Sequence, residues 1–186
     1  MGLLVLGVAG FAALHLLAAH AGLRQRLREG LGRRRFGLAY GGLSVAGLVV
    51  IILGWRAAPF DAVYEPPLWG AHANLLFMLV AFLLFGQFLA GGTWRQRLRF
   101  PMALAVVVWA VGHLLANGDG ASLILFGGLA LYAAAHAVLA ARSGVALSPL
   151  GWGGNGLGLL AGLGLYALML HFHQTLIGVA VPLSGS

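Results

Sequence analysis

Six long apolar runs divide this chain of 186 residues and set the class of fold that it can adopt. The runs cover residues 3–21, 37–55, 70–90, 101–117, 121–141 and 154–179. Each is close to the ~20 residues that a helix needs to cross the hydrocarbon core of a bilayer. Because 61% of the residues are hydrophobic and only 8% are charged, the sequence cannot supply the surface of a soluble domain. The sequence therefore predicts an all-α, polytopic membrane helix bundle of about six transmembrane helices, with residues 1–186 as a single domain.

The arginines predict the orientation of the chain in the membrane. All eleven basic residues are arginines, and ten of them lie in the first, third and fifth connections between runs, or at their edges: Arg24, Arg26, Arg28, Arg33, Arg34, Arg35, Arg95, Arg97, Arg99 and Arg142. Positive charge is retained on the cytoplasmic side. We therefore expect both termini on the outer side of the membrane, which would be the periplasmic side of a bacterial inner membrane. The fourth and fifth runs are joined so tightly, through residues 117–119, that a re-entrant hairpin is the alternative to two full spans.

The net charge of +7 could suggest a nucleic-acid partner. The arginines, however, flank apolar runs and lack the interleaved aromatic residues and the sustained groove that nucleic-acid binding needs. We expect no nucleic-acid partner, and we expect the lipid bilayer to surround most of the chain.

Polar residues interrupt the segment from Trp109 to Gly127, WAVGHLLANGDGASLILFG. Polar groups at membrane depth are expensive and are usually functional. With helical spacing, Trp109, His113 and Asn117 lie on one stripe, with small residues beside the histidine. This stripe could receive a flat ligand or a neighbouring helix.

The absence of cysteine removes several chemistries. Disulfides, iron–sulfur clusters, covalent c-type haem, thiolate catalysis and cysteine zinc sites are all excluded. Histidine is left as the principal metal-ligating residue. The four carboxylates are not paired on helices, so a two-carboxylate acid–base mechanism is not expected.

Glycines recur every four residues at Gly154, Gly158 and Gly162 in the last run, and at Gly37 and Gly41 in the second. Small residues at this spacing let membrane helices approach closely. We interpret both stripes as packing surfaces, either within one chain or between two copies of it.

Two of the seven histidines are expected near the middle of the membrane. By helical rise, His15 lies roughly 18 Å below the outer start of the first run, and His113 roughly 18 Å above the inner start of the fourth. In a core of ~30 Å these levels differ by only about 6 Å. Any one of these histidines could instead be a buried imidazole bonded to a neighbouring helix.

Two neutral imidazoles at one level on different helices suit the axial ligation of a b-type haem. The small residues around both histidines leave room for a porphyrin. The same pair could hold a metal ion, but zinc usually needs three or four protein ligands. His20, His136 and His173 are alternatives for either ligand position.

The order of several residues along the chain resembles that of the NnrU family of bacterial membrane proteins. These residues are His15, Leu23, Arg24, Leu31, Gly32, Phe36, Tyr40, Ser44, Ala58, Pro59 and Trp69. The most specific part is HLLANGDGASLILFG at residues 113–127, and HQTLIGV at residues 173–179 resembles the closing motif. One departure is that Arg99, Phe100 and Pro101 stand where the family usually has a basic residue, a histidine and a proline.

NnrU proteins are similar to the zeta-carotene isomerases, which are haem b membrane enzymes. The resemblance implies His15 and His113 as haem ligands, with Trp109, Asn117 and Asp119 shaping the pocket and its outer mouth. It also implies a link to denitrification and nitric oxide metabolism, and a hydrophobic or small-gas substrate. The isomerases have a cysteine three residues before the second histidine, whereas this chain has Ala110, so ligand switching through a thiolate is not available.

Two other functions stay open. One is a non-enzymatic accessory or assembly factor, whose partner would be a nitrogen-oxide reductase or its maturation machinery. The other is a lipid methyltransferase, which the segment Arg99, Phe100, Pro101 faintly resembles. The histidine and acidic residues that hold a methyl donor are missing, which disfavours methyl transfer.

Overall fold

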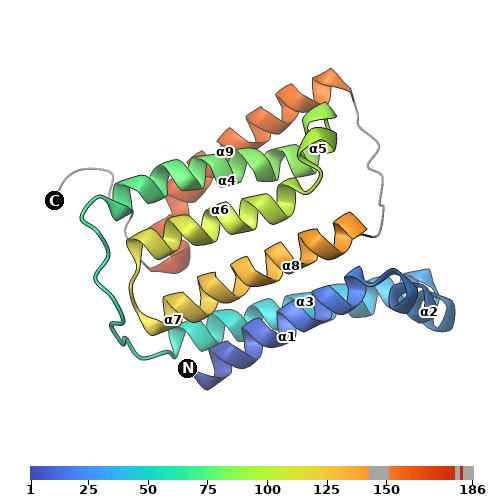
Figure 1. Cartoon of the computed structure of the whole chain (residues 1–186), viewed down its shortest axis with the longest axis horizontal. Coiled ribbons are helices and arrows are strands. Elements are labelled where there is room, and N and C mark those ends of the chain that lie inside the picture. Colours follow the sequence, from blue (N-terminus) through green and yellow to red (C-terminus); the bar gives the residue numbers. More distant parts are fainter. Residues whose placement is uncertain (143–150, 179–180, 182–186) are drawn as a thin grey trace. The chain divides into compact units, whose positions relative to one another are not determined.

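A computed structural model describes residues 1–142, 151–178 and 181, and within them the structure is helical, with one isolated bridge between Ala62 and Asp119. The chain forms two compact units (Figure 1). Unit 1 holds Met1–Glu65 and the described residues from Asn117 to Arg142, and unit 2 holds Pro66–Ala116 and the described residues from Gly151 onward.

Unit 1 is built on α1 (Gly2–Ala19), α3 (Arg33–Arg56) and α8 (Gly128–Arg142). Its buried core contains Leu4, Val8, Ile51 and Ala121. The backbones of α1 and α3 nearly touch, because a Cβ atom on Gly54 would lie 2.6 Å from the Cα atom of Leu4. Leu4 is completely buried at this crossing, which joins the first two apolar runs.

The helix that ends in α8 begins irregularly. A single turn, α7 (Gly120–Ser122), leads into the π-helix η1 (Leu123–Gly127), which continues directly into α8. Phe126 of η1 is buried against Trp55, with ring centroids 5.9 Å apart. A π-turn is often found at functional sites, because its extra residue changes the face that the following helix presents.

Two short helices occupy segments that the arginines had led us to expect as loops. These are α2 (Ala21–Leu31) and α5 (Thr93–Leu98). The expectation was wrong because arginine and glutamine are good helix formers, although they are too polar to appear in an apolar run. The chain turns from α2 into α3 at Gly32, whose φ of +76° is open to glycine and costly for other residues.

Unit 2 is built on α4 (Gly70–Ala90), α6 (Pro101–Ala116) and α9 (Trp152–Ile177), with α4 packed on both of the others (Figure 1). The predicted stripe of Gly154, Gly158 and Gly162 is buried in this packing. A Cβ atom on Gly162 would lie 2.6 Å from the carbonyl oxygen of Phe82. The packing role is therefore confirmed for α9. Around Gly37 and Gly41, in contrast, an added Cβ atom would meet nothing within 4 Å, so the packing role of that stripe stays a prediction.

A buried amide network joins α4, α5 and α9. The Asn155 side chain accepts a hydrogen bond from the backbone N–H of Trp94 at 3.0 Å and donates one to the Thr93 hydroxyl at 2.6 Å. Gln87, which is 2% exposed, donates to the carbonyl oxygen of Asn155 at 3.0 Å. Because Gln87 and Asn155 are both buried, these bonds hold the three helices together from inside unit 2.

The all-helical class is confirmed, and each predicted run corresponds to a helix. Within the described part of the chain, five helices are long and apolar enough to cross a membrane. The remaining run, the fourth, forms α6, which has 16 residues and so extends about 24 Å. Val179, the end of the last predicted run, and the C-terminal residues 182–186 lie outside the described residues.

The close approach of α9 and α4 yields a first prediction. We expect Gly162→Ala to lower the free energy of unfolding by about 1–3 kcal/mol, because the new methyl group meets backbone atoms that cannot move aside. The measurement is thermal unfolding of the detergent-purified protein. Gly164→Ala is the matched control, since nothing in the described structure lies within 4 Å of that position. Equal melting temperatures for both variants would contradict the packing role.

Candidate functional site

His15 is held on α1 by its own helix. Its Nδ1 atom lies 2.8 Å from the carbonyl oxygen of Phe11, four residues earlier. The two rings are stacked, with centroids 4.0 Å apart and planes at 29°. Because a carbonyl oxygen can only accept, Nδ1 must carry the proton in this arrangement. The imidazole is therefore fixed in both orientation and tautomer.

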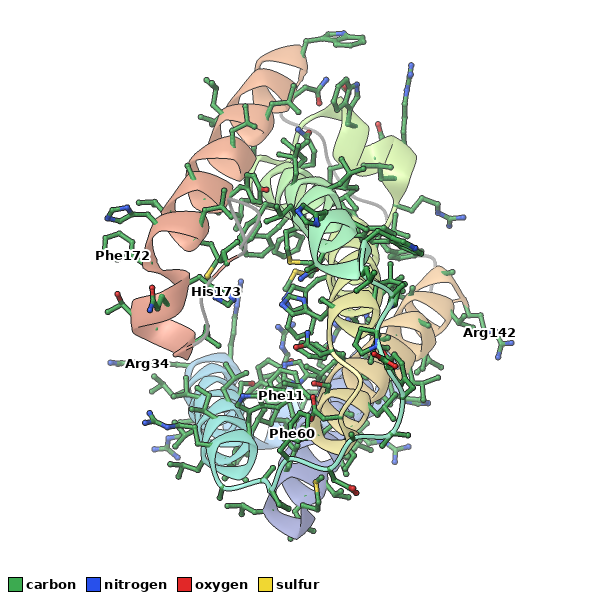
Figure 2. The ribbon with its side chains drawn as sticks, turned by 90° about the vertical axis from the view of Figure 1, so that its left-hand side faces the viewer. Phe11, Arg34, Phe60, Arg142, Phe172 and His173 are labelled. Atoms are coloured by element: carbon green, nitrogen blue, oxygen red, sulfur yellow. The ribbon has the colours of Figure 1, made fainter. Side chains whose placement is uncertain are left out.

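Aromatic and histidine side chains from two other helices of unit 1 surround the His15 ring. Tyr40 of α3 and Tyr132 of α8 lie with ring centroids 5.4 Å and 5.7 Å from it. His136, one turn after Tyr132, lies with its ring centroid 6.0 Å from that of the tyrosine. Phe11, labelled in Figure 2, completes this group, which we call the His15 cluster: Phe11, His15, Tyr40, Tyr132 and His136.

His113 is held on α6 in the same way. Its Nδ1 atom lies 2.9 Å from the carbonyl oxygen of Trp109, and the two rings have centroids 5.0 Å apart. Ala110 and Gly112 are buried beside it. His173, an alternative ligand, lies on α9 of the same unit. The predicted stripe of small residues and the contact between Trp109 and His113 are thus present in unit 2.

The two histidines therefore share one local chemistry. When Nδ1 donates to a carbonyl, the lone pair of the neutral ring is on Nε2, which is the atom that ligates iron or another metal. A hydrogen bond from the second ring nitrogen to a backbone carbonyl is also the usual support for a metal-bound histidine. Both imidazoles are therefore in the tautomer that an axial haem ligand requires.

His20, an alternative ligand, is used differently. It precedes α2, and its Nδ1 atom accepts a hydrogen bond from the backbone N–H of Leu23 at 3.4 Å. This bond requires the other tautomer, in which the proton is on Nε2. His20 therefore acts as the N-cap of α2, and in that role its Nε2 atom has no lone pair for a metal.

Asn117 does not continue the helical stripe, because α6 ends at Ala116. The prediction extended the helical spacing beyond Ala116, whereas the chain turns at Gly118. The carbonyl oxygen of Asn117 accepts a hydrogen bond of 2.7 Å from the hydroxyl of Tyr64. Partial burial raises the pKa of the Tyr64 phenol above its ordinary value, and the Asp119 carboxylate adds to the rise. The phenol is thus neutral and able to donate at neutral pH.

Asp119 caps the helix that follows it. One carboxylate oxygen accepts from the backbone N–H of Ser122 at 2.9 Å, and the other accepts from the Ser122 hydroxyl at 2.5 Å. Backbone bonds from Val63 to Gly118 and from Gly120 to Asp61 fasten the loop between α3 and α4 to the same turn. Asn117 and Asp119 therefore stabilise a strapped turn of unit 1, and their contribution to a ligand pocket stays a prediction.

His15 belongs to unit 1 and His113 to unit 2, and each unit is described by itself. Ligation of one haem by this pair accordingly stays a prediction. Among the described residues, no group of three or more His, Cys, Asp or Glu side chains is placed to hold a metal ion. A haem needs only two protein ligands, so this finding does not bear on haem ligation.

Our interpretation of the sequence gave no role in the site to Tyr132, and it named His136 only as an alternative ligand. One pattern could have identified both of them. An aromatic residue stands four positions before a histidine in Phe11/His15, Trp109/His113 and Tyr132/His136, and all three pairs have ring centroids within 6.0 Å. Because residues at i and i+4 are neighbours on a helix, this spacing is visible in the sequence.

The fold and these intramembrane histidines define a polytopic helical membrane protein with polar groups held inside its units. The family model described as NnrU protein matches residues 3–181, nearly the whole chain. The chain therefore belongs to the NnrU family. No curated protein and no solved structure matches it.

The strapped turn provides a second prediction. We expect Asp119→Ala to lower the free energy of unfolding by about 0.5–2 kcal/mol, because the first N–H groups of α7 lose their cap. The measurement is thermal unfolding at neutral pH. Asp61→Ala is the control, since Asp61 contributes its backbone carbonyl to the turn. An Asp119→Ala variant as stable as the control would contradict the capping role.

Proposed function

We propose that this protein binds one haem b, with the Nε2 atoms of His15 and His113 as axial ligands. The observation that carries the proposal is the shared hydrogen bond from Nδ1 to the carbonyl four residues earlier, at 2.8 Å and 2.9 Å. A buried neutral imidazole with its lone pair on Nε2 is what haem iron requires. Family membership supports the proposal through the relation of NnrU proteins to haem-containing isomerases.

The neighbouring residues have defined tasks in this proposal. Trp109 and Phe11 pack against the ligand rings and restrict their rotation, so that each ligand is preorganised. Gly112, next to His113, lets α4 pack closely on α6, because a Cβ atom there would lie 2.6 Å from the Cβ atom of Phe77. Haem would supply an iron centre for electron transfer or, after release of one axial ligand, for substrate binding.

Two reactions suit such a centre in a membrane. One is isomerisation of a hydrophobic polyene that enters from the lipid, and the other is redox chemistry of a small gas such as nitric oxide. Both substrates reach a site in the hydrocarbon core without passing through water. We place the protein in the bacterial inner membrane with both termini outside, on the distribution of its arginines.

The test is the absorption spectrum of the protein purified in detergent from haem-replete cells, oxidised and dithionite-reduced. We expect a Soret band with sharp reduced α and β bands, because two histidine ligands give six-coordinate, low-spin iron. In His15→Ala and His113→Ala we expect those sharp bands to be lost and the haem content to fall severalfold.

His72→Ala is the matched control, because His72 is an exposed histidine at the start of α4. It should retain the wild-type spectrum. Absence of haem from the wild-type protein, despite normal insertion, would overturn the proposal. That result would favour the accessory-factor function, in which a membrane partner co-purifies and both histidines tolerate substitution.

A further inference from the structure

The helix α2 has two faces of opposite character. At about 100° per residue, Leu23, Leu27 and Leu31 fall on one stripe, and Gln25 and Glu29 fall on the opposite side. Arg24 and Arg28 border the stripe on one side and Arg26 borders it on the other. This arrangement is typical of helices that lie in a membrane interface rather than across it.

The apolar face of α2 is only partly covered within unit 1, where Leu23 is half-buried. No residue of α2 is buried, and Leu27 and Leu31 are 40% and 46% exposed. On the polar face, the Gln25 side chain donates a hydrogen bond of 2.8 Å to the Glu29 carboxylate. Leucine side chains exposed to water are energetically unfavourable. Whether lipid covers this stripe depends on where α2 lies relative to the bilayer.

The connectivity fixes that position. The helix α2 lies between α1 and α3, which are both candidate membrane spans, so it must lie where one span leaves the membrane and the next enters it. The turn at Gly32 changes the direction of the chain between α2 and α3. The stripe of α2 is thus within reach of the bilayer surface, whichever side of the membrane this surface faces.

The charge of this segment identifies the kind of surface. Residues 21–35 contain six arginines and one acidic residue, Glu29, which is already bonded to Gln25. Arg28 lies over the ring of Phe36, with its guanidinium carbon 5.5 Å from the centroid. This contact joins α2 to α3. Arg34 extends outward from α3, as Figure 2 shows. Guanidinium groups form strong paired hydrogen bonds with phosphate.

We propose that α2 lies in the plane of the membrane interface and binds the headgroups of anionic phospholipids. Its leucine stripe is buried at the top of the acyl chains, and the bordering arginines pair with lipid phosphates. Basic residues next to a membrane span attract anionic lipids in this way. The proposal is independent of haem binding, because it rests on α2 and its arginines alone.

The absence of cysteine makes the test direct, because a single introduced cysteine takes a spin label at one known position. We would label Leu27→Cys, on the apolar face, and Gln25→Cys, its matched control on the polar face. Both would be reconstituted as the full chain in vesicles of phosphatidylglycerol and phosphatidylcholine. Oxygen partitions into lipid and a nickel chelate stays in water, so their relaxation of the label reports its surroundings.

We expect the label at Leu27→Cys to be relaxed by oxygen and protected from the nickel chelate, and the label at Gln25→Cys to show the reverse. Two outcomes would overturn the proposal. Nickel access at Leu27→Cys equal to that at Gln25→Cys would mean that the stripe is in water. Protection of Leu27→Cys from both reagents would mean that protein covers it.

The role of charge is tested by Arg24→Gln with Arg26→Gln, against Arg97→Gln with Arg142→Gln as a control of equal charge change. Arg97 and Arg142 are exposed arginines of other helices. Native mass spectrometry of the full chain should show retention of phosphatidylglycerol falling roughly tenfold in the first pair and remaining near wild type in the second. Equal retention in both pairs, or equal retention of phosphatidylcholine by the wild type, would overturn the assignment of anionic lipid.

Discussion

The interior of a membrane offers no water to hydrogen-bond polar groups, and this constraint accounts for most of the structure. Several polar side chains bond to nearby backbone groups, although the Asn74 Oδ1 and Gln87 Oε1 atoms are buried without a hydrogen-bond partner. His15 and His113 bond to carbonyl groups of their own helices, and Asn155 bonds to the backbone and side chains of α5. Local satisfaction of this kind lets a helix carry an imidazole into hydrocarbon without a partner charge.

The same bond that makes each imidazole tolerable also prepares it for chemistry. Donation from Nδ1 to a carbonyl selects the tautomer whose lone pair is on Nε2, and the aromatic residue one turn earlier limits the rotation of the ring. A single substitution of Phe11 or Trp109 should therefore affect the ligand geometry without removing a ligand.

The sequence was sufficient to predict the helices but not their mutual contacts. The six apolar runs correspond to α1, α3, α4, α6, the segment from α7 to α8, and α9, because twenty apolar residues have few alternatives in a bilayer. The polar helix α2 escaped prediction, since its leucines are spaced four apart among arginines that suggested a loop. Asn117 was assigned to a helical stripe because nothing in the apolar pattern marks Ala116 as the last helical residue. The proximity of Tyr40 and Tyr132 to His15 depends on packing between helices, which spacing along the chain does not encode.

Electron paramagnetic resonance of the oxidised protein tests the central claim most directly, because it reports the axial ligands of ferric iron rather than the presence of haem alone. Two imidazole ligands predict a low-spin rhombic signal in the wild type, replaced by a high-spin signal in His15→Ala and in His113→Ala. An unchanged low-spin signal in either variant would show that another side chain ligates the iron, and would contradict the account of this pair.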